Sequence, residues 1–146
     1  MVMRRSIIGA ALFLSAVTAV SAAEFKAKTV VLVHGAFADG SSWHKVIPIL
    51  ENAGLKVVAV QNPLDSLEND VAATKRAIRD AEGPVVLVGH SWGGAVITEA
   101  GTDDKVKSLV YVAAYAPDAG QSVETASAKY PPWKASRRSS RTPTDT

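Results

Sequence analysis

The sequence predicts an α/β fold in which about four mostly parallel strands are flanked by helices. Short apolar runs alternate with stretches of helical pattern, which is typical of strand–helix–strand units. The runs are apolar throughout, as expected of strands that helices cover on both faces. The 146 residues suffice for one modest domain. The order of the strands in the sheet does not follow from this pattern alone.

The first half of the predicted domain contains two strands and two helices. Residues 28–35 (KTVVLVHG) form a β-branched run that ends in Gly, which predicts the first buried strand. Residues 41–54 begin with two serines suited to an N-cap and end in Gly, which predicts a helix that Pro48 weakens or kinks. Residues 55–60 (LKVVAV) predict the second strand. Residues 66–83 start like a capping box and end in Gly, so they predict the second helix.

The second half continues the same alternation. Residues 84–89 (PVVLVG) predict the third strand, and residues 91–101 predict the third helix. Residues 107–115 (KSLVYVAAY) predict the fourth strand. Beyond residue 115 the clear periodicity ends, and the chain shows no internal repeat.

Both ends of the chain differ from the predicted domain, which covers residues 24–130. Residues 1–23 combine a basic start, an apolar run and small residues, which predicts a cleaved signal peptide and export to the periplasm or the medium. The apolar run is short for a membrane span and contains polar residues, so we expect no stable span after cleavage. Residues 131–146 are polar, basic and rich in Ser and Thr, which predicts a disordered tail.

Composition disfavours several classes of function. The chain contains no Cys, which excludes disulfides and thiolate metal sites. The net charge of +2 comes from the two ends, because residues 24–128 hold nine Lys or Arg against thirteen Asp or Glu. This body has no basic stripe, which disfavours nucleic-acid binding. Asp103 and Asp104 resemble a solvated turn, and no companion residues at ligand spacing indicate a metal site.

One motif carries the chemistry. Gly89-His90-Ser91-Trp92-Gly93 fits G-x-S-x-G and lies between a predicted strand and a predicted helix. A serine at this turn sits in a strained bend with its hydroxyl outside the sheet, and the glycines leave room for the backbone. The start of the following helix directs free N–H groups at the same place. We therefore predict that Ser91 is a nucleophile and that the backbone N–H of Trp92 stabilises an oxyanion.

The second oxyanion donor is expected from the loop after the first strand. His34 and Gly35 end that strand, and the backbone N–H of Ala36 is placed to face the pocket, because parallel strands end at one mouth. We expect the His34 side chain to brace this loop by hydrogen bonds. His90 adjoins the serine in a tight turn where neighbouring side chains diverge, so a packed, hydrogen-bonded role is favoured over that of a general base.

Three segments resemble the α/β-hydrolase fold superfamily over roughly residues 28–130: VVLVHGAFADGSSWHKVIPIL, VVLVGHSWGGAVI and SLVYVAAYAPDAG. The sequence is most similar to the esterase and hydroxynitrile-lyase-like branch with a His-Gly-Ala loop. This resemblance implies the strand order second, first, third, fourth, and an oxyanion hole formed by Ala36 and Trp92. It also implies catalysis without a cofactor on esters, lactones or related small carbonyl compounds.

The chain departs from this family after the serine. In the family, a catalytic acid and a histidine follow the nucleophile, whereas the three histidines here are His34, His44 and His90. Asp118 follows the fourth predicted strand, where some members place the acid, but no base is found. The cap segment and the later strands of the family are also missing, and the sequence near Trp133 resembles a frameshift or premature stop. The chain is therefore expected to be the N-terminal half of the fold.

These observations leave more than one hypothesis for function. The first is an exported serine hydrolase for carboxylic esters or related small carbonyl compounds, impaired because the triad histidine is missing; hydroxynitrile cleavage and a haloperoxidase-like side reaction belong to the same class. The second is a non-catalytic truncated fragment or a small-molecule-binding remnant. In a third, a dimer partner or second chain supplies the missing half. The fourth strand is expected to be an exposed apolar edge, which favours self-association.

Overall fold

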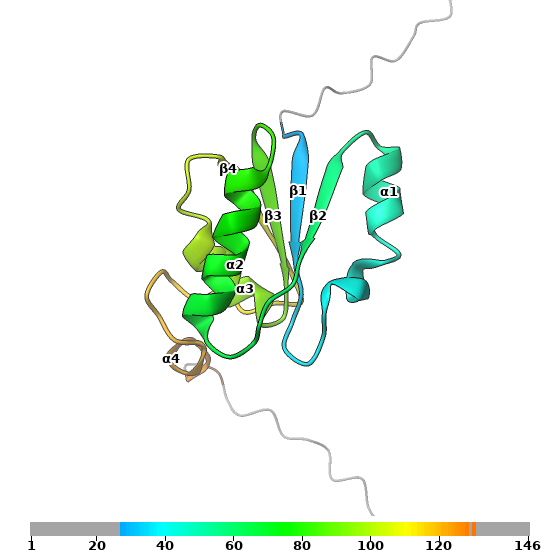
Figure 1. The fold of residues 1–146 in the computed structure, drawn as a ribbon. Coiled ribbons are helices and arrows are strands. Elements are labelled where there is room, and N and C mark those ends of the chain that lie inside the picture. Colours follow the sequence, from blue (N-terminus) through cyan, green and yellow to red (C-terminus); the bar gives the residue numbers. More distant parts are fainter. Residues whose placement is uncertain (1–26, 129, 131–146) are drawn as a thin grey trace, which may run out of the picture.

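A computed structural model describes residues 27–128 and 130, and its elements follow the predicted alternation. The strands are β1 (Thr29–Val33), β2 (Lys56–Val60), β3 (Val85–His90) and β4 (Val106–Val112). They form one parallel sheet in the order β2-β1-β3-β4, which confirms the predicted fold class (Figure 1). The predicted signal peptide (residues 1–23) and basic tail (residues 131–146) lie outside the described residues.

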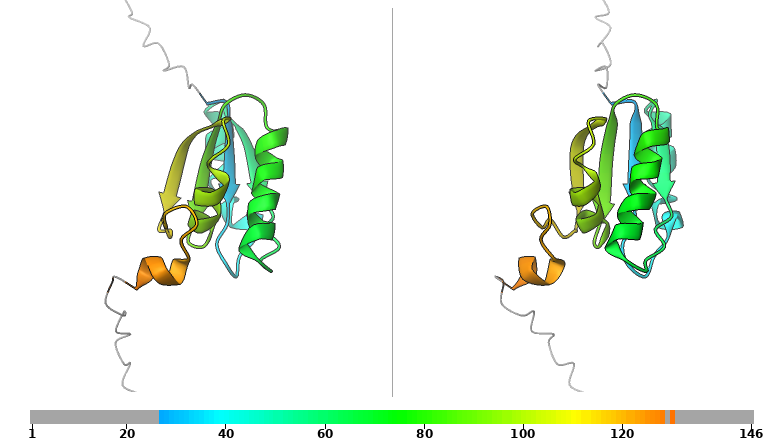
Figure 2. Two further views of the ribbon diagram at one scale, coloured as in Figure 1. Left: turned by 90° about the vertical axis from the view of Figure 1, so that its left-hand side faces the viewer. Right: turned by 60° about the vertical axis from the view of Figure 1, so that its left-hand side comes forward.

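Helices cover the two faces of the sheet unequally. The helices α2 (Leu67–Asp80) and α3 (Gly93–Ala100) lie on one face, over a core that contains Val31, Val33 and Leu87. The 3₁₀ helix η1 (Gly40–Trp43) and α1 (Ile47–Asn52) lie on the other face, over Val30 and Leu32. The short helix α4 (Val123–Ser127) lies beyond the carboxyl ends of the strands (Figure 2). None of the described helices is long and apolar enough to cross a membrane.

The sequence predicted one continuous helix over residues 41–54. This prediction is wrong, because the structure divides the segment into η1 and α1. The carboxylate of Asp39 caps η1 by accepting a hydrogen bond of 2.8 Å from the backbone N–H of Ser41. Pro48 lies in the first turn of α1, where its missing N–H removes no helical hydrogen bond. The proline therefore begins a second helix instead of kinking a single one.

The β4 strand forms one edge of the sheet and is paired only with β3 among the described strands. Val110 and Val112 point to the face that α1 shares, and they remain 40% and 41% exposed. On the opposite face, the Tyr111 hydroxyl lies 2.9 Å from the Thr98 hydroxyl of α3. The α3 face of β4 is therefore only partly packed, since Tyr111 is itself 37% exposed, and the other face is open within residues 27–128.

Candidate active site

Ser91 occupies a tight turn between the end of β3 and the start of α3. Its φ angle is +52°, in the left-handed region that L-residues with a Cβ seldom adopt. The carbonyl oxygen of Ser91 accepts hydrogen bonds from the backbone N–H groups of Gly94 (3.0 Å) and Tyr115 (3.1 Å). The turn is thus fixed from α3 and from the segment after β4, which maintains a strained backbone at the predicted nucleophile.

The glycines around Ser91 allow backbones to approach closely. A methyl group on Gly93 would lie 2.5 Å from the carbonyl oxygen of Val33, so α3 could not pack this closely on β1. A methyl group on Gly89 would lie 2.5 Å from the carbonyl oxygen of Gly93. A methyl group on Gly35 would lie 3.0 Å from the Cβ of Ser91. Each of the three glycines therefore sits where a side chain would push the turn out of place.

The two predicted oxyanion donors line one cavity. Ala36 and Trp92 border a cavity of about 280 Å³, whose other walls come from the β2–α2 loop and the first turns of α2. Neither backbone N–H donates a hydrogen bond to any residue that the structure describes. Ala36 and Trp92 thus line one cavity, and their backbone N–H groups are not used by any described residue, which is compatible with the predicted oxyanion hole.

Asp70 of α2 belongs to this site, and sequence reasoning missed it. Its carboxylate is fully buried; Oδ2 accepts a 2.8 Å hydrogen bond from Nε1 of Trp92, and Oδ1 accepts one of 2.8 Å from the backbone N–H of Leu64. A signal was present in the sequence. Asp70 lies at helical spacing from Thr74 and Ile78, so a charged residue falls on the buried face of an amphipathic helix.

His34 is committed to structural hydrogen bonds. Its ring is 1% exposed, and Nε2 accepts a 3.0 Å hydrogen bond from the backbone N–H of Asn62. The hydrogen of the neutral ring therefore lies on Nδ1, which donates to the carbonyl oxygen of Gly35 at 2.9 Å. Both nitrogens are occupied, so the ring joins the loops that follow β1 and β2, as its sequence context predicts.

The other two histidines lie at the surface. The His90 ring is exposed and packs edge-on against Trp43, with 6.4 Å between the ring centroids. The hydrogen-bonded role expected of His90 is wrong, because within the described part of the chain this exposed ring makes no hydrogen bond and only packs against Trp43. His44 is also exposed, and its Nδ1 lies 3.0 Å from the carbonyl oxygen of Ser41. Neither ring is hydrogen-bonded to Ser91.

The Ser91 hydroxyl makes no hydrogen bond to any described residue. Asp118, the candidate acid, lies exposed in the loop between β4 and α4, where its backbone N–H donates to Oε1 of Gln121 at 3.1 Å. The structure does not bring Asp118 into contact with a histidine. Among the residues described, no group of three His, Asp or Glu side chains is arranged to hold a metal ion.

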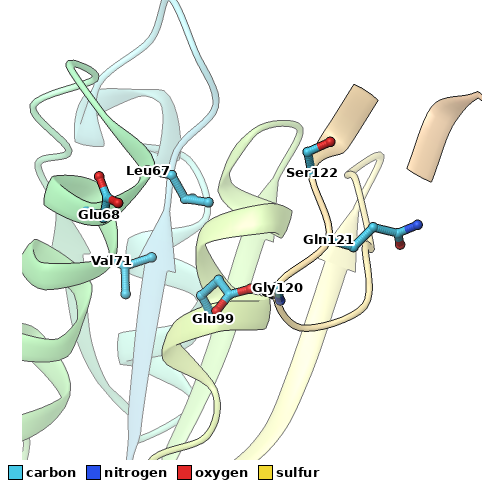
Figure 3. Close-up of a pocket in the computed structure, with 7 residues that line it drawn as sticks. All are labelled: Leu67, Glu68, Val71, Glu99, Gly120, Gln121 and Ser122. Carbon is cyan, nitrogen blue, oxygen red and sulfur yellow. Dashed lines mark hydrogen bonds between the residues drawn. The ribbon is translucent and has the colours of Figure 1, made fainter. Parts of the chain in front are cut away.

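A second cavity, of about 370 Å³, opens between α2, α3 and the segment before α4. Leu67 and Val71 point into it from α2, whereas Glu99 of α3 reaches Gly120 and accepts a 2.6 Å hydrogen bond from its backbone N–H (Figure 3). This cavity contains none of the residues predicted to act in catalysis.

Comparisons with known proteins agree with this geometry. The model of the family described as "Alpha/beta hydrolase family" matches residues 30–145. The chain is similar to salicylic acid-binding protein 2 of Nicotiana tabacum, with 35% identity over 106 residues that cover 62% of this chain and 41% of that protein. It is also similar to the carbendazim hydrolyzing esterase of Nocardioides sp. (strain SG-4G), with 35% identity over 109 residues, 64% of this chain and 44% of that one.

Solved structures show the same fold. A crystal structure of a pyrethroid hydrolase from Sphingobium faniae JZ-2 aligns with a TM-score of 0.54 and 30% identity, covering 60% of this chain and 40% of that chain. The chain spans about two fifths of the length of the curated relatives it matches.

Proposed function

We propose, from the premise that this chain belongs to the alpha/beta hydrolase family, that Ser91 is the nucleophile of a serine hydrolase for carboxylic esters or related small carbonyl compounds. The observation that carries the proposal is the strained turn between β3 and α3, which holds Ser91 at a φ angle of +52°. The relatives described as a carbendazim hydrolyzing esterase and as a polyneuridine aldehyde esterase, the latter from Rauvolfia serpentina, support this substrate class.

The proposed reaction is acyl transfer through a covalent intermediate. Oγ of Ser91 attacks the ester carbonyl and loses its proton to a base, and the carbonyl oxygen becomes an oxyanion. The backbone N–H groups of Ala36 and Trp92 donate to that oxyanion in their shared cavity. The intermediate collapses, the alcohol leaves with a proton, and water then hydrolyses the acyl-serine. No step needs a cofactor.

We also propose that turnover by these 146 residues is impaired, because the triad histidine is missing from them. No histidine follows the serine in the 146 residues, and both ring nitrogens of His34 are already hydrogen-bonded. A serine hydroxyl is a weak nucleophile without an adjacent base. Removing the triad base lowers turnover by roughly 10⁶ in a well-studied serine protease, and we expect a deficit of that order.

Chemical rescue tests the nucleophile directly. The full chain is incubated with p-nitrophenyl acetate, with and without imidazole as an external base, and acetylated peptides are identified by mass spectrometry. Ser91→Ala is the matched control, because it reports the hydrolysis that imidazole alone produces. We expect imidazole-dependent acetylation of Ser91 and release of p-nitrophenol above the rate of the variant. Equal release from both proteins, with no acetyl group on Ser91, would overturn the assignment.

The alternative function is that of a non-catalytic fragment or small-molecule-binding remnant. One observation favours it: the Ser91 hydroxyl has no hydrogen-bond partner in the described residues, although the adjoining cavity is formed. A chain that binds small carbonyl compounds at this cavity, yet never acquires an acetyl group on Ser91 with imidazole, would fit this alternative.

Export and self-association are proposals as well. The signal-like composition of residues 1–23 supports export, and N-terminal sequencing of the secreted protein would identify a cut near Ala22 or Ala23. The half-exposed Val110 and Val112 at the β4 edge support pairing between copies. Sedimentation velocity over a range of concentrations distinguishes a monomer from larger species.

A further inference from the structure

A single buried carboxylate connects two walls of the cavity that Ala36 and Trp92 line. Asp70 has no exposed surface, and its two oxygens each accept one hydrogen bond of 2.8 Å, from Nε1 of Trp92 and from the backbone N–H of Leu64. Trp92 and Leu64 both line the cavity. We propose that Asp70 is the positioning residue of the oxyanion hole, an inference that rests on the proposed function of Ser91.

The free-energy cost of burying this carboxylate is poorly compensated if the side chain serves only the stability of the fold. Burying a carboxylate is unfavourable unless it is paired and hydrogen-bonded. The ion pairs among the described residues are Lys56–Glu82 and Arg79–Asp80, so no cation neutralises Asp70. The side chain instead accepts two charge-assisted hydrogen bonds, which are stronger and more directional than neutral ones. Such bonds hold their two donors in fixed places.

Both donors need to be held. Trp92 is the residue directly after the strained Ser91, and its backbone N–H is the proposed oxyanion donor, so any movement of the indole is transmitted to that N–H through one Cα. Leu64 has a φ angle of +61°, which is unfavourable for a residue with a side chain. The buried hydroxyl of Thr74 donates to the backbone carbonyl oxygen of Asp70 at 3.0 Å, a bond within α2 that does not involve the carboxylate.

The role of Asp70 is geometric and not electrostatic. A negative charge beside the cavity opposes a developing oxyanion, so charge alone would weaken catalysis. Asn has the size of Asp but a single acceptor oxygen, so Asp70→Asn leaves one of the two donors facing an amide N–H. The substitution therefore releases one of the two donor residues from its hydrogen bond, without opening a cavity in the core.

Binding of a boronic acid tests the inference without a catalytic base. n-Butylboronic acid forms a B–O bond with Oγ of Ser91 and releases one proton to solvent, and the tetrahedral boronate anion places a hydroxyl in the oxyanion hole. Boron NMR detects the tetrahedral species, and titration calorimetry gives Kd. The proteins are the full chain, Asp70→Asn, Trp92→Phe, the double variant, and Asp80→Asn as a matched control on the exposed end of the same helix.

We expect Asp70→Asn to raise Kd between about tenfold and 10²-fold, whereas Asp80→Asn leaves Kd unchanged. Trp92→Phe keeps the ring but removes the indole N–H, so adding Asp70→Asn to it should raise Kd by much less than in the wild type. If Asp70→Asn forms an adduct that depends on Ser91 and has an unchanged Kd, the positioning role of Asp70 is overturned. The assignment of Ser91 as the nucleophile is unaffected by that result. An adduct that persists in Ser91→Ala overturns the nucleophile instead.

A second measurement does not depend on adduct formation. In the ligand-free chain, nitrogen–proton NMR reports the backbone amides of Ala36 and Trp92 directly. Asp70→Asn should shift and broaden these two signals more than the amides of the β1–β2 ladder, while circular dichroism confirms that the variant is folded. Unchanged signals at both positions would overturn the positioning role even if no boronate binds.

Discussion

The strained backbone at Ser91 leads to a prediction about stability. Its direction is one that a simple loss of contacts would not produce. Replacing Ser91 by Gly removes the predicted nucleophile, yet we expect the variant to be more stable than Ser91→Ala. The φ angle of +52° places the Cβ too close to the following carbonyl oxygen, and alanine keeps that Cβ, whereas glycine lacks it. The Ser91 hydroxyl makes no hydrogen bond to a described residue, so the alanine variant loses little.

The magnitude follows from two opposing terms. The left-handed conformation costs a residue with a Cβ roughly 1–2 kcal/mol. Glycine offsets part of that gain, because it loses about 0.5–1 kcal/mol more conformational entropy on folding. The net stabilisation of the glycine variant over the alanine variant is therefore about 0.5–1 kcal/mol, which corresponds to a rise in Tm of about 2–8 °C for a domain of this size.

Urea and thermal unfolding, followed by circular dichroism, measure both variants beside the wild type. The pair of substitutions is its own control, because each removes the hydroxyl and only one removes the Cβ. An unfolding free energy of Ser91→Gly equal to or below that of Ser91→Ala would refute the claim that the turn stores strain at the nucleophile.

Three further substitutions test the surrounding structure. Gly93→Ala should lower the unfolding free energy by about 1–3 kcal/mol in urea titrations, because its methyl group meets backbone atoms of β1. His34→Phe should lower it by about 1–3 kcal/mol, because it leaves the buried N–H of Asn62 without an acceptor; a wild-type midpoint would contradict this. The hydrogen bond from Lys56 lowers the pKa of Glu82 below 4.5, so this pair stabilises the fold above that pH and the stabilisation is lost as acid titrates Glu82. Lys56→Met should therefore flatten the loss of Tm as the pH falls below the usual pKa of Glu, and an unaltered acid limb would count against the pair.

The elements that sequence patterns predicted best are those with redundant signals. Each strand is a short apolar run, and parallel strands buried on both faces leave few alternatives. The turn at Ser91 was predictable because glycines two residues before and after the serine specify its geometry, and the structure shows both in backbone contact. The strand order came from the family resemblance, since periodicity carries no information on which strands are neighbours.

The elements that were missed depend on contacts distant in sequence. The division of residues 41–54 into η1 and α1 depends on the carboxylate of Asp39, which precedes the apparent helix and competes with its serines for the N-cap. The link from Asp70 to Trp92 spans 22 residues and exists only because α2 and α3 pack side by side. The short α4, absent from the predicted elements, is capped by Ser122 and has no buried face to give a periodic pattern.

In the described part of the chain, the residues with a strained backbone lie at the carboxyl ends of the strands, where the candidate site also lies. Its non-glycine residues with positive φ are Phe37, Leu64, Ser91 and Ala113, and one of them follows each of the four strands. Strain persists only where surrounding contacts fix it. At the predicted nucleophile those contacts come from β1, β3, α2, α3 and the segment after β4, all within residues 27–128. We therefore expect this part of the chain to hold the proposed nucleophile and oxyanion donors in place without the missing triad histidine, which is why an external base is expected to suffice for acyl transfer.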